Sequence, residues 1–145
     1  MRLRNIPRAE GTIQSHQAAI KRPEDQKGCW KQVFGNENPI HIEIGMGKGQ
    51  FIMKLAKEHP DINYIGIERY SSVLLRALQK MEIEPLPNIR FLCMDASIIT
   101  EVFDKEEVAK IYLNFSDPWP KERHAKRRLT SRQFFERYDK ILAGN

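Results

Sequence analysis

Hydrophobic and polar positions follow two rhythms from about Pro39 onward. Ile40, Ile42 and Ile44 alternate with polar neighbours, which is typical of a strand, whereas the apolar positions in 51–56 recur at helical spacing. The same succession repeats along the rest of the chain. The pattern predicts strands at 40–44, 64–67, 89–94 and within 108–115, and helices at 51–56, 73–81, 98–103 and 134–142.

This regular alternation of strand and helix predicts an α/β fold, with a parallel sheet and helices on both of its faces. Residues 1–38 show no clear period, and we interpret them as an extended or partly mobile basic N-terminal arm that is anchored by Trp30 and Phe34. We expect residues 39–145 to form the α/β domain. The length of 145 residues favours a single domain.

Acidic residues stand at or near the ends of the four predicted strands: Glu43, Glu68, Asp95 and Asp117. Ligands of open α/β sheets bind beyond the carboxyl ends of the strands, so these four carboxylates are expected to line one rim. A single acid after a strand is more often a turn or helix-cap residue. Four of them in equivalent positions are harder to explain in that way.

Three glycines, Gly45, Gly47 and Gly49, follow the first strand. Glycine adopts positive φ and lets the backbone pass close to a ligand, although a tight turn without a ligand has the same composition. The dinucleotide fingerprint is absent, because Gln50 stands where its third glycine belongs. A phosphate-cradling GxxxxGK[ST] loop is also absent, which argues against ATP.

Two of the acids complete a nucleoside pocket beside this loop. Glu68 offers two acceptor oxygens to the hydroxyls of a ribose, and Asp95 is expected to face an adenine edge. S-adenosylmethionine carries a net positive charge, so it suits an acidic rim better than a pyrophosphate does. The sequence therefore favours S-adenosylmethionine as the cofactor.

The segment after the fourth strand combines an aromatic ring, a carboxylate and two prolines. Trp119 can stack on an unpaired base, and Asp117 can accept hydrogen bonds from the N1–H and N2 amino group of guanine. A proline-rich turn with a packed tryptophan is the simpler alternative.

Charge is concentrated just beyond this loop. Between Lys121 and Arg132 stand six basic residues against one acid, which equals the net charge of +5 for the whole chain. Such a stripe on a neutral body indicates a polyanion site, and RNA is favoured over duplex DNA because RNA loops expose their bases. A solvated charged segment would look similar. The expected RNA contacts are Lys121, Arg123, His124, Lys126, Arg127 and Arg128.

Cysteine usage and hydropathy set the remaining expectations. Cys29 and Cys93 have no metal-ligand spacing, so we expect no metal site and a reducing, cytoplasmic setting. No apolar run reaches the roughly 20 residues of a membrane helix, and no signal peptide is predicted.

Three segments together resemble the tRNA (guanine-N7)-methyltransferase family: IEIGMGKGQF at 42–51, YIGIE at 64–68 and YLNFSDPWPKERHAKRR at 112–128. The resemblance extends from about Trp30 to the C-terminus. It implies the Rossmann-like class I methyltransferase fold, with S-adenosylmethionine bound by or beside Glu43, Glu68, Asp95 and Asp117. It also implies that Asp117 is catalytic, that Lys121 contacts the substrate, and that the target is the guanine at position 46 in the variable loop of tRNA.

The family continues past the last helix into strands that complete the guanine pocket. This chain stops at Asn145, so we interpret it as the N-terminal part of the domain, with the C-terminal strands missing. The fourth strand would then be an exposed sheet edge, which favours pairing with another chain. We expect little or no activity from this form, and self-association is consistent with such an edge, although the sequence leaves the oligomeric state open.

Two alternatives remain open. A methyltransferase acting on another nucleic-acid atom, such as an exocyclic amine, usually carries an Asn/Asp-Pro-Pro-aromatic loop, whereas Trp119 stands between the prolines here. The other is an RNA-binding fragment that has lost catalysis. A dehydrogenase is disfavoured by the glycine spacing.

Overall fold

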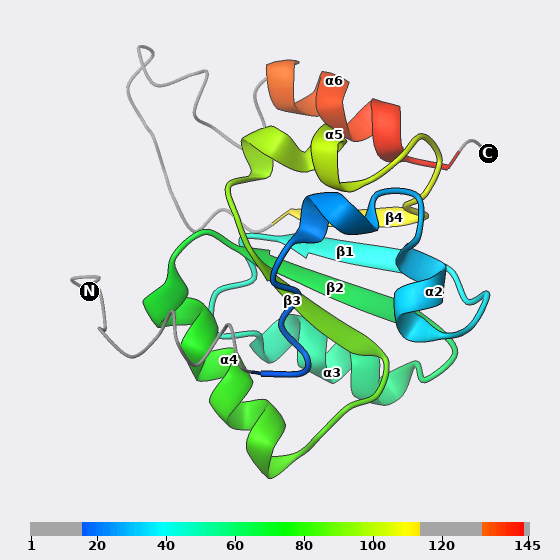
Figure 1. Cartoon of the computed structure of the whole chain (residues 1–145). Helices are drawn as coiled ribbons and strands as arrows, with labels where there is room; N and C mark the ends of the chain where they lie inside the picture. Colours follow the sequence, from blue (N-terminus) through cyan, green and yellow to red (C-terminus); the bar gives the residue numbers. More distant parts are fainter. Residues whose placement is uncertain (1–15, 114–131, 144–145) are drawn as a thin grey trace.

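The computed structural model describes residues 16–113 and 132–143. At its centre lies a sheet of four parallel strands in the order β3-β2-β1-β4 (Figure 1). The strands are β1 (Ile40–Ile44), β2 (Asn63–Glu68), β3 (Ile89–Cys93) and β4 (Lys110–Leu113). The predicted parallel sheet is confirmed. Strands β2 and β3 extend from one side of β1 and β4 lies on the other, so the strand order reverses beside β1, where α/β sheets bind ligands.

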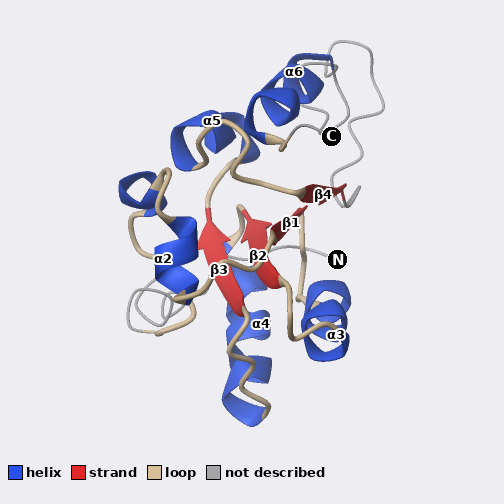
Figure 2. Ribbon diagram, turned by 90° about the vertical axis from the view of Figure 1, so that its right-hand side faces the viewer, coloured by secondary structure: helices blue, strands red, loops and turns tan. Residues whose placement is uncertain are grey.

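Helices cover both faces of the sheet, as predicted (Figure 2). On one face lie α3 (Gln50–Glu58) and α4 (Ser71–Ile83); the other carries α2 (Trp30–Phe34), α5 (Ile99–Val102) and α6 (Arg132–Ile141). Two 3-10 helices, η1 (Pro23–Gln26) and η2 (Ala96–Ile98), complete the set among the described residues. The helix predicted at 98–103 is therefore shorter than expected and is preceded by η2.

Two apolar layers form because successive side chains of a strand point to opposite faces. Ile42 and Ile65 pack toward α5, α6 and Trp30, whereas Tyr64 and Phe91 pack toward α3 and α4. The alternation seen in the sequence is thus the alternation between these two layers.

The segment before β1 corrects one expectation, because residues 16–38 are not an extended arm. The backbone of Ala18–Ile20 pairs with the outer edge of β3, where Phe91 donates to Ala18 at 2.8 Å and Ile20 donates to Phe91 at 3.0 Å. Trp30 is fully buried, and its indole N–H donates to the carbonyl of Val102 at 2.8 Å. Its predicted anchoring role is confirmed. Residues 1–15 lie outside the described residues, and the division at residue 39 stays a prediction.

The chain returns to the sheet after α6. Leu142 forms a parallel bridge with Val108, and Ala143 donates a backbone hydrogen bond to Val108 at 2.7 Å. Val108 lies two residues before β4, on a short approach to that strand. Within the described ranges, β4 itself is paired with β1 along one side.

Candidate functional site

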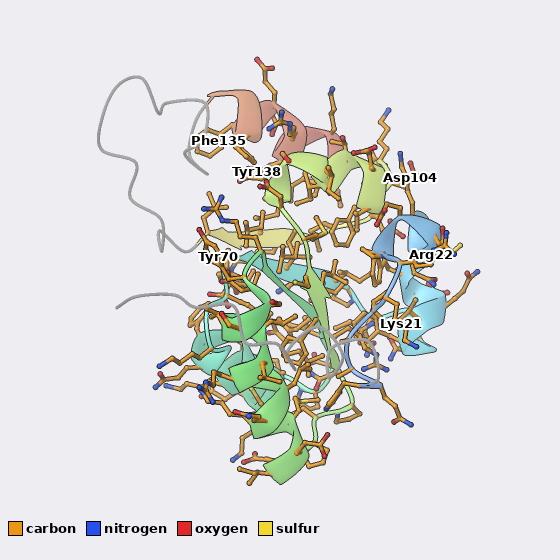
Figure 3. All side chains as sticks on the ribbon, turned by 60° about the vertical axis from the view of Figure 1, so that its left-hand side comes forward. Lys21, Arg22, Tyr70, Asp104, Phe135 and Tyr138 are labelled. Carbon is orange, nitrogen blue, oxygen red and sulfur yellow. The ribbon has the colours of Figure 1, made fainter. Side chains whose placement is uncertain are left out.

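The carboxyl ends of the parallel strands form one rim, and three of the predicted acids stand there. Glu43 lies within β1, Glu68 is the last residue of β2, and Asp95 follows β3 by two residues. The side chains of Tyr70 and of Asp104 mark the two opposite ends of the sheet in Figure 3, with Tyr70 on the rim side. The structure therefore brings these three predicted residues to one edge.

The glycine loop between β1 and α3 is fixed to the end of β2. The N–H groups of Gly45 and Met46 both donate to the carbonyl of Ile67, at 2.9 and 3.0 Å. Gly45, Gly47 and Gly49 have φ values of 77°, 60° and 81°, a region that side chains with a Cβ rarely adopt. The predicted positive φ of these glycines is confirmed, and α3 begins directly after the loop, at Gln50.

Met46 anchors the same loop to strand β2. Its buried side chain occupies the notch above Gly66 in β2, and a methyl group at position 66 would overlap the Met46 sulfur. A methyl group at Gly49 would also lie 3.6 Å from the Met46 terminal carbon. The contact between Met46 and Gly66 was not predicted from the sequence, although a glycine inside a strand is a sign of close approach by another group.

Glu68 holds backbone groups on both sides. Its Oε1 accepts the N–H of Gly47 at 3.0 Å and its Oε2 accepts the N–H of Tyr70 at 3.1 Å. The carboxylate is buried, so these bonds link the glycine loop to the start of α4.

Glu43 is buried with an unsatisfied oxygen. Only 3% of the residue is exposed, and Oε1 has no hydrogen-bond partner among the described residues. Burial, together with the nearby charge of Glu68, raises the pKa of Glu43 to about 7. The register places Gly66 on one side of Glu43 and Tyr112 on the other. This carboxyl group can pair with a cation or a hydrogen-bond donor that enters from the rim.

Asp95 differs from the two buried acids. It is exposed, and its Oδ1 accepts the N–H of Ser97 at 2.8 Å at the start of η2. Arg69 approaches its other oxygen at 4.0 Å. Asp95 is therefore both a helix cap and a rim residue.

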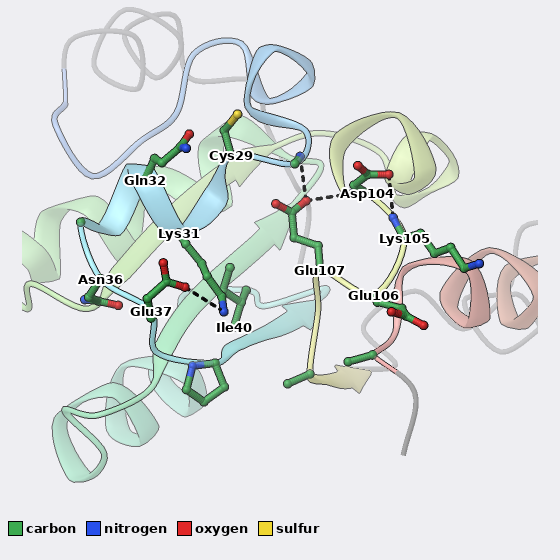
Figure 4. A pocket seen from close by; sticks show the side chains of 15 residues that line it. Cys29, Lys31, Gln32, Asn36, Glu37, Ile40, Asp104, Lys105, Glu106 and Glu107 are labelled. Carbon is green, nitrogen blue, oxygen red and sulfur yellow. Dashed lines mark hydrogen bonds and ion pairs between the residues drawn. The ribbon is translucent and has the colours of Figure 1, made fainter.

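The opposite end of the sheet holds a cavity of about 830 Å³ (Figure 4). At its wall, Glu107 accepts three backbone N–H groups, from Gly28 at 3.0 Å, Trp30 at 3.2 Å and Asp104 at 2.8 Å. These bonds join the segment before α2 to the connection between α5 and β4. The arrangement explains how this end is held together.

Several predicted site residues lie outside the described residues. They are the proposed catalytic Asp117 and the expected RNA contacts Lys121, Arg123, His124, Lys126, Arg127 and Arg128. Within residues 16–113 and 132–143, no group of three or more His, Cys, Asp or Glu side chains is arranged to hold a metal ion. In the same ranges, no helix has the length and apolar character needed to cross a membrane.

Comparison with known proteins agrees with this architecture. Residues 37–145 match the model of a family described as "Putative methyltransferase". The chain is 61% identical over 142 residues to a tRNA (guanine-N(7)-)-methyltransferase of Lachnoclostridium phytofermentans, covering 98% of this chain and 66% of that protein. It is 52% identical over 145 residues to the protein of the same name in Brevibacillus brevis, covering 100% and 68%. The chain belongs to the tRNA (guanine-N(7)-)-methyltransferase family.

A solved structure supports the fold independently. An antibiotic-related methyltransferase superposes with a TM-score of 0.66 at 21% identity, covering 88% of this chain and 63% of that one. At that identity the likeness shows the fold alone, and the predicted Rossmann-like methyltransferase fold is confirmed. The chain spans about two thirds of the length of the curated methyltransferases that it matches.

Proposed function

We propose that this chain binds S-adenosylmethionine at the rim and serves methyl transfer to N7 of the guanine at position 46 in tRNA. The observation that carries the proposal is the buried, unpartnered oxygen of Glu43 beside the glycine loop. Leaving a buried acceptor unpaired costs about 1–3 kcal/mol, so a partner entering from outside is favoured. A chain of this family with such an acidic rim fits a cationic methyl donor.

The rim residues fit the cofactor by their chemistry. S-adenosylmethionine supplies a methyl group on a positively charged sulfur. Glu43 is proposed to face the positive groups of the cofactor, Glu68 to accept from the ribose, and Asp95 to face the adenine. The glycine loop of Gly45, Gly47 and Gly49 would bring backbone close to it. The hydrogen bonds that hold Glu68 in place support this assignment, because they fix its orientation before any ligand arrives.

Methyl transfer to guanine N7 requires little acid–base catalysis by the protein. N7 carries a lone pair in the ring plane and no proton, so no general base is required. The work of the chain is then to align the base and exclude water. Asp117 is proposed to hold the guanine edge and to stabilise the positive charge that develops on the ring.

The nucleic acid is proposed to be held by the basic segment after Asp117. Lys121 would contact the substrate, and Arg123, His124, Lys126, Arg127 and Arg128 would lie along the RNA. Such contacts position the RNA without reading its sequence. A cytoplasmic location is part of the proposal, since tRNA is the substrate.

Self-association is a further part of the proposal. Among the described residues, β4 pairs with β1 along one side, and on its approach Val108 meets Leu142. The remaining edge of Lys110–Leu113 could pair with a second copy. Light scattering at increasing protein concentration tests this. A mass that stays at one chain throughout would contradict it.

The test of the function is the position of the transferred methyl group. Unmodified tRNA is incubated with a full-length enzyme that contains this chain and with methyl-labelled S-adenosylmethionine, and digested nucleosides are analysed by mass spectrometry. We expect 7-methylguanosine from that enzyme and the loss of most of it in its Asp117→Ala variant, whereas the 145-residue chain alone should give little or none. An exocyclic methylated base would instead support the other nucleic-acid methyltransferase, and equal rates for Asp117→Ala would remove Asp117 from the mechanism. An RNA-binding fragment would bind tRNA but give no heat with S-adenosylhomocysteine.

A further inference from the structure

Helices α3 and α4 lie on the same face of the sheet (Figure 2). Side chains of both helices line a groove between them. It encloses about 370 Å³ and is lined by residues of both helices and of the turn after α4. Its volume lies at the low end of the roughly 300–1,000 Å³ of pockets that take small ligands. The groove is thus large enough for one small organic unit at a time.

The groove is rich in positive charge. Lys54 and Lys57 approach from α3 and Lys80 from α4, and one acid, Glu84, faces them. Glu84 pairs with Lys57 at 2.9 Å, whereas Lys54 and Lys80 make no ion pair among the described residues. Both members of the Lys57–Glu84 pair are exposed, so this pair contributes little to stability. Lys54 and Lys80 are therefore available to an anion, and an anion can replace Glu84 as the partner of Lys57.

The floor of the groove is apolar. Met53 and Leu86 are partly buried in the layer beneath α3 and α4, and Ile83 beside them is 86% exposed. Lysines near the last turns of helices are explained by the helix dipole, but that effect does not explain an exposed isoleucine. Cations around an apolar floor suit a ligand that has both anionic and apolar parts.

The groove also begins at the rim. Gln50, which is one of the lining residues, is the first residue of α3 and directly follows the glycine loop. Gln50, Lys54 and Lys57 recur at helical spacing and lie along one stripe of α3. A polymer with one unit at the rim can therefore continue down this stripe.

We propose that the α3–α4 groove is a second RNA-binding surface, which holds tRNA backbone at a distance from the target guanine. The proposal rests on the proposed function, in which tRNA is the substrate. Phosphates contact Lys54 and Lys80, while the sugar or an unpaired base lies against Ile83 and the floor. The phosphates supply affinity, and their neutralisation releases counterions.

The test compares two lysine pairs in the whole chain. Lys54→Gln/Lys80→Gln removes the groove charges, and Lys27→Gln/Lys105→Gln removes two exposed lysines near the opposite end of the sheet as a control. Binding of an unmodified tRNA transcript is measured across a range of salt concentrations with saturating S-adenosylhomocysteine. We expect the groove variant to bind about tenfold more weakly, with the slope of log affinity against log salt reduced by roughly 1.5. The control should stay within about twofold.

A third variant separates the apolar contribution. Ile83→Ser should weaken tRNA binding about fivefold and leave the salt slope unchanged, since it removes no charge. The affinity for S-adenosylhomocysteine should be the same in all three variants. Wild-type tRNA binding by the groove variant, or an equal loss in the control, overturns the proposal while the proposed function stands. Competition by polyglutamate as effective as by RNA would also overturn it. A wild-type chain that binds no tRNA would contradict both.

Discussion

Two glutamates at opposite ends of the sheet are used in opposite ways. Glu107, near the amino ends of the strands, accepts three backbone N–H groups at 2.8–3.2 Å (Figure 4). Glu43, near the carboxyl ends, is almost fully buried, and one of its oxygens has no partner among the described residues. The first carboxylate joins two segments of the fold, whereas the second is held at a cost in free energy.

The difference distinguishes a carboxylate whose hydrogen-bond partners are all within the fold from one that is oriented for a ligand. A buried acceptor without a partner destabilises the protein, and such groups concentrate at functional sites. Glu68 lies between the two cases, because it fixes backbone groups and still belongs to the rim. The presence of a carboxylate therefore does not by itself identify the site. What identifies the site is whether the carboxylate oxygens already accept hydrogen bonds from within the fold.

Substitution of Glu43 should change cofactor affinity, whereas substitution of Glu107 should change the stability of the fold. The largest effect is expected on cofactor affinity. Glu43→Gln removes a negative charge that faces the proposed cationic ligand. We expect the affinity for S-adenosylmethionine to fall tenfold to a hundredfold, which corresponds to about 1.5–3 kcal/mol for a hydrogen bond to a charged group. Isothermal titration calorimetry measures this change. The melting temperature should stay equal or rise, because a buried carboxylate is replaced by a neutral amide of the same shape.

The loop beside Glu43 gives the next effect. Gly66→Ala should displace Met46 and with it the glycine loop, at a cost of about 1–3 kcal/mol for overpacking, and weaken cofactor binding. Adding Met46→Ala makes room for the new methyl group and should restore part of the affinity. A double-mutant cycle on cofactor affinity and on melting temperature tests this, and strictly additive effects would show that the two residues are not coupled.

At the other end of the sheet, Glu107→Ala should act on stability alone. Three backbone N–H groups would lose their acceptor, and because they are partly solvated we expect a loss of roughly 2 kcal/mol. Urea unfolding measures the change. Cofactor affinity should remain at the wild-type value, and a large fall in affinity without unfolding would remove the contrast between the two ends.

The smallest effect is a dependence on pH. The folded-state pKa of Glu43 is raised to about 7, so folding favours its protonated form. Glu43 therefore weakens the fold progressively as pH rises from its unfolded pKa to about 7, and adds no further loss above that. A cationic ligand prefers the carboxylate, so its affinity should fall by up to about tenfold per unit as pH drops below 7. Calorimetry over this range should give a flatter profile for Glu43→Gln.

The sequence predicted the sheet well because the alternation of Ile40, Ile42 and Ile44 reports which face of a strand is buried. It also placed Glu68 and Asp95 at the correct edge, since parallel strands end together. Residues 16–38 were misjudged, because their structure depends on tertiary contacts such as Trp30 to Val102 and Ala18 to Phe91. Periodicity carries no information about such contacts.

Two features of the site were likewise beyond the sequence. The difference between Glu43 and Glu107 depends on which N–H groups lie nearby, and those come from segments distant in the chain. The contact of Met46 with Gly66 depends on the loop folding back over β2. Gly66 inside a strand was the one available signal.

The most direct test of the account is a calorimetric titration of the wild-type chain with S-adenosylhomocysteine, at a pH above the pKa of Glu43. We expect saturable binding at a single site, because the glycine loop and Glu68 are already held in place by hydrogen bonds. A folded chain, verified by circular dichroism in the same buffer, that releases no heat of binding would contradict the assignment of this rim as the cofactor site.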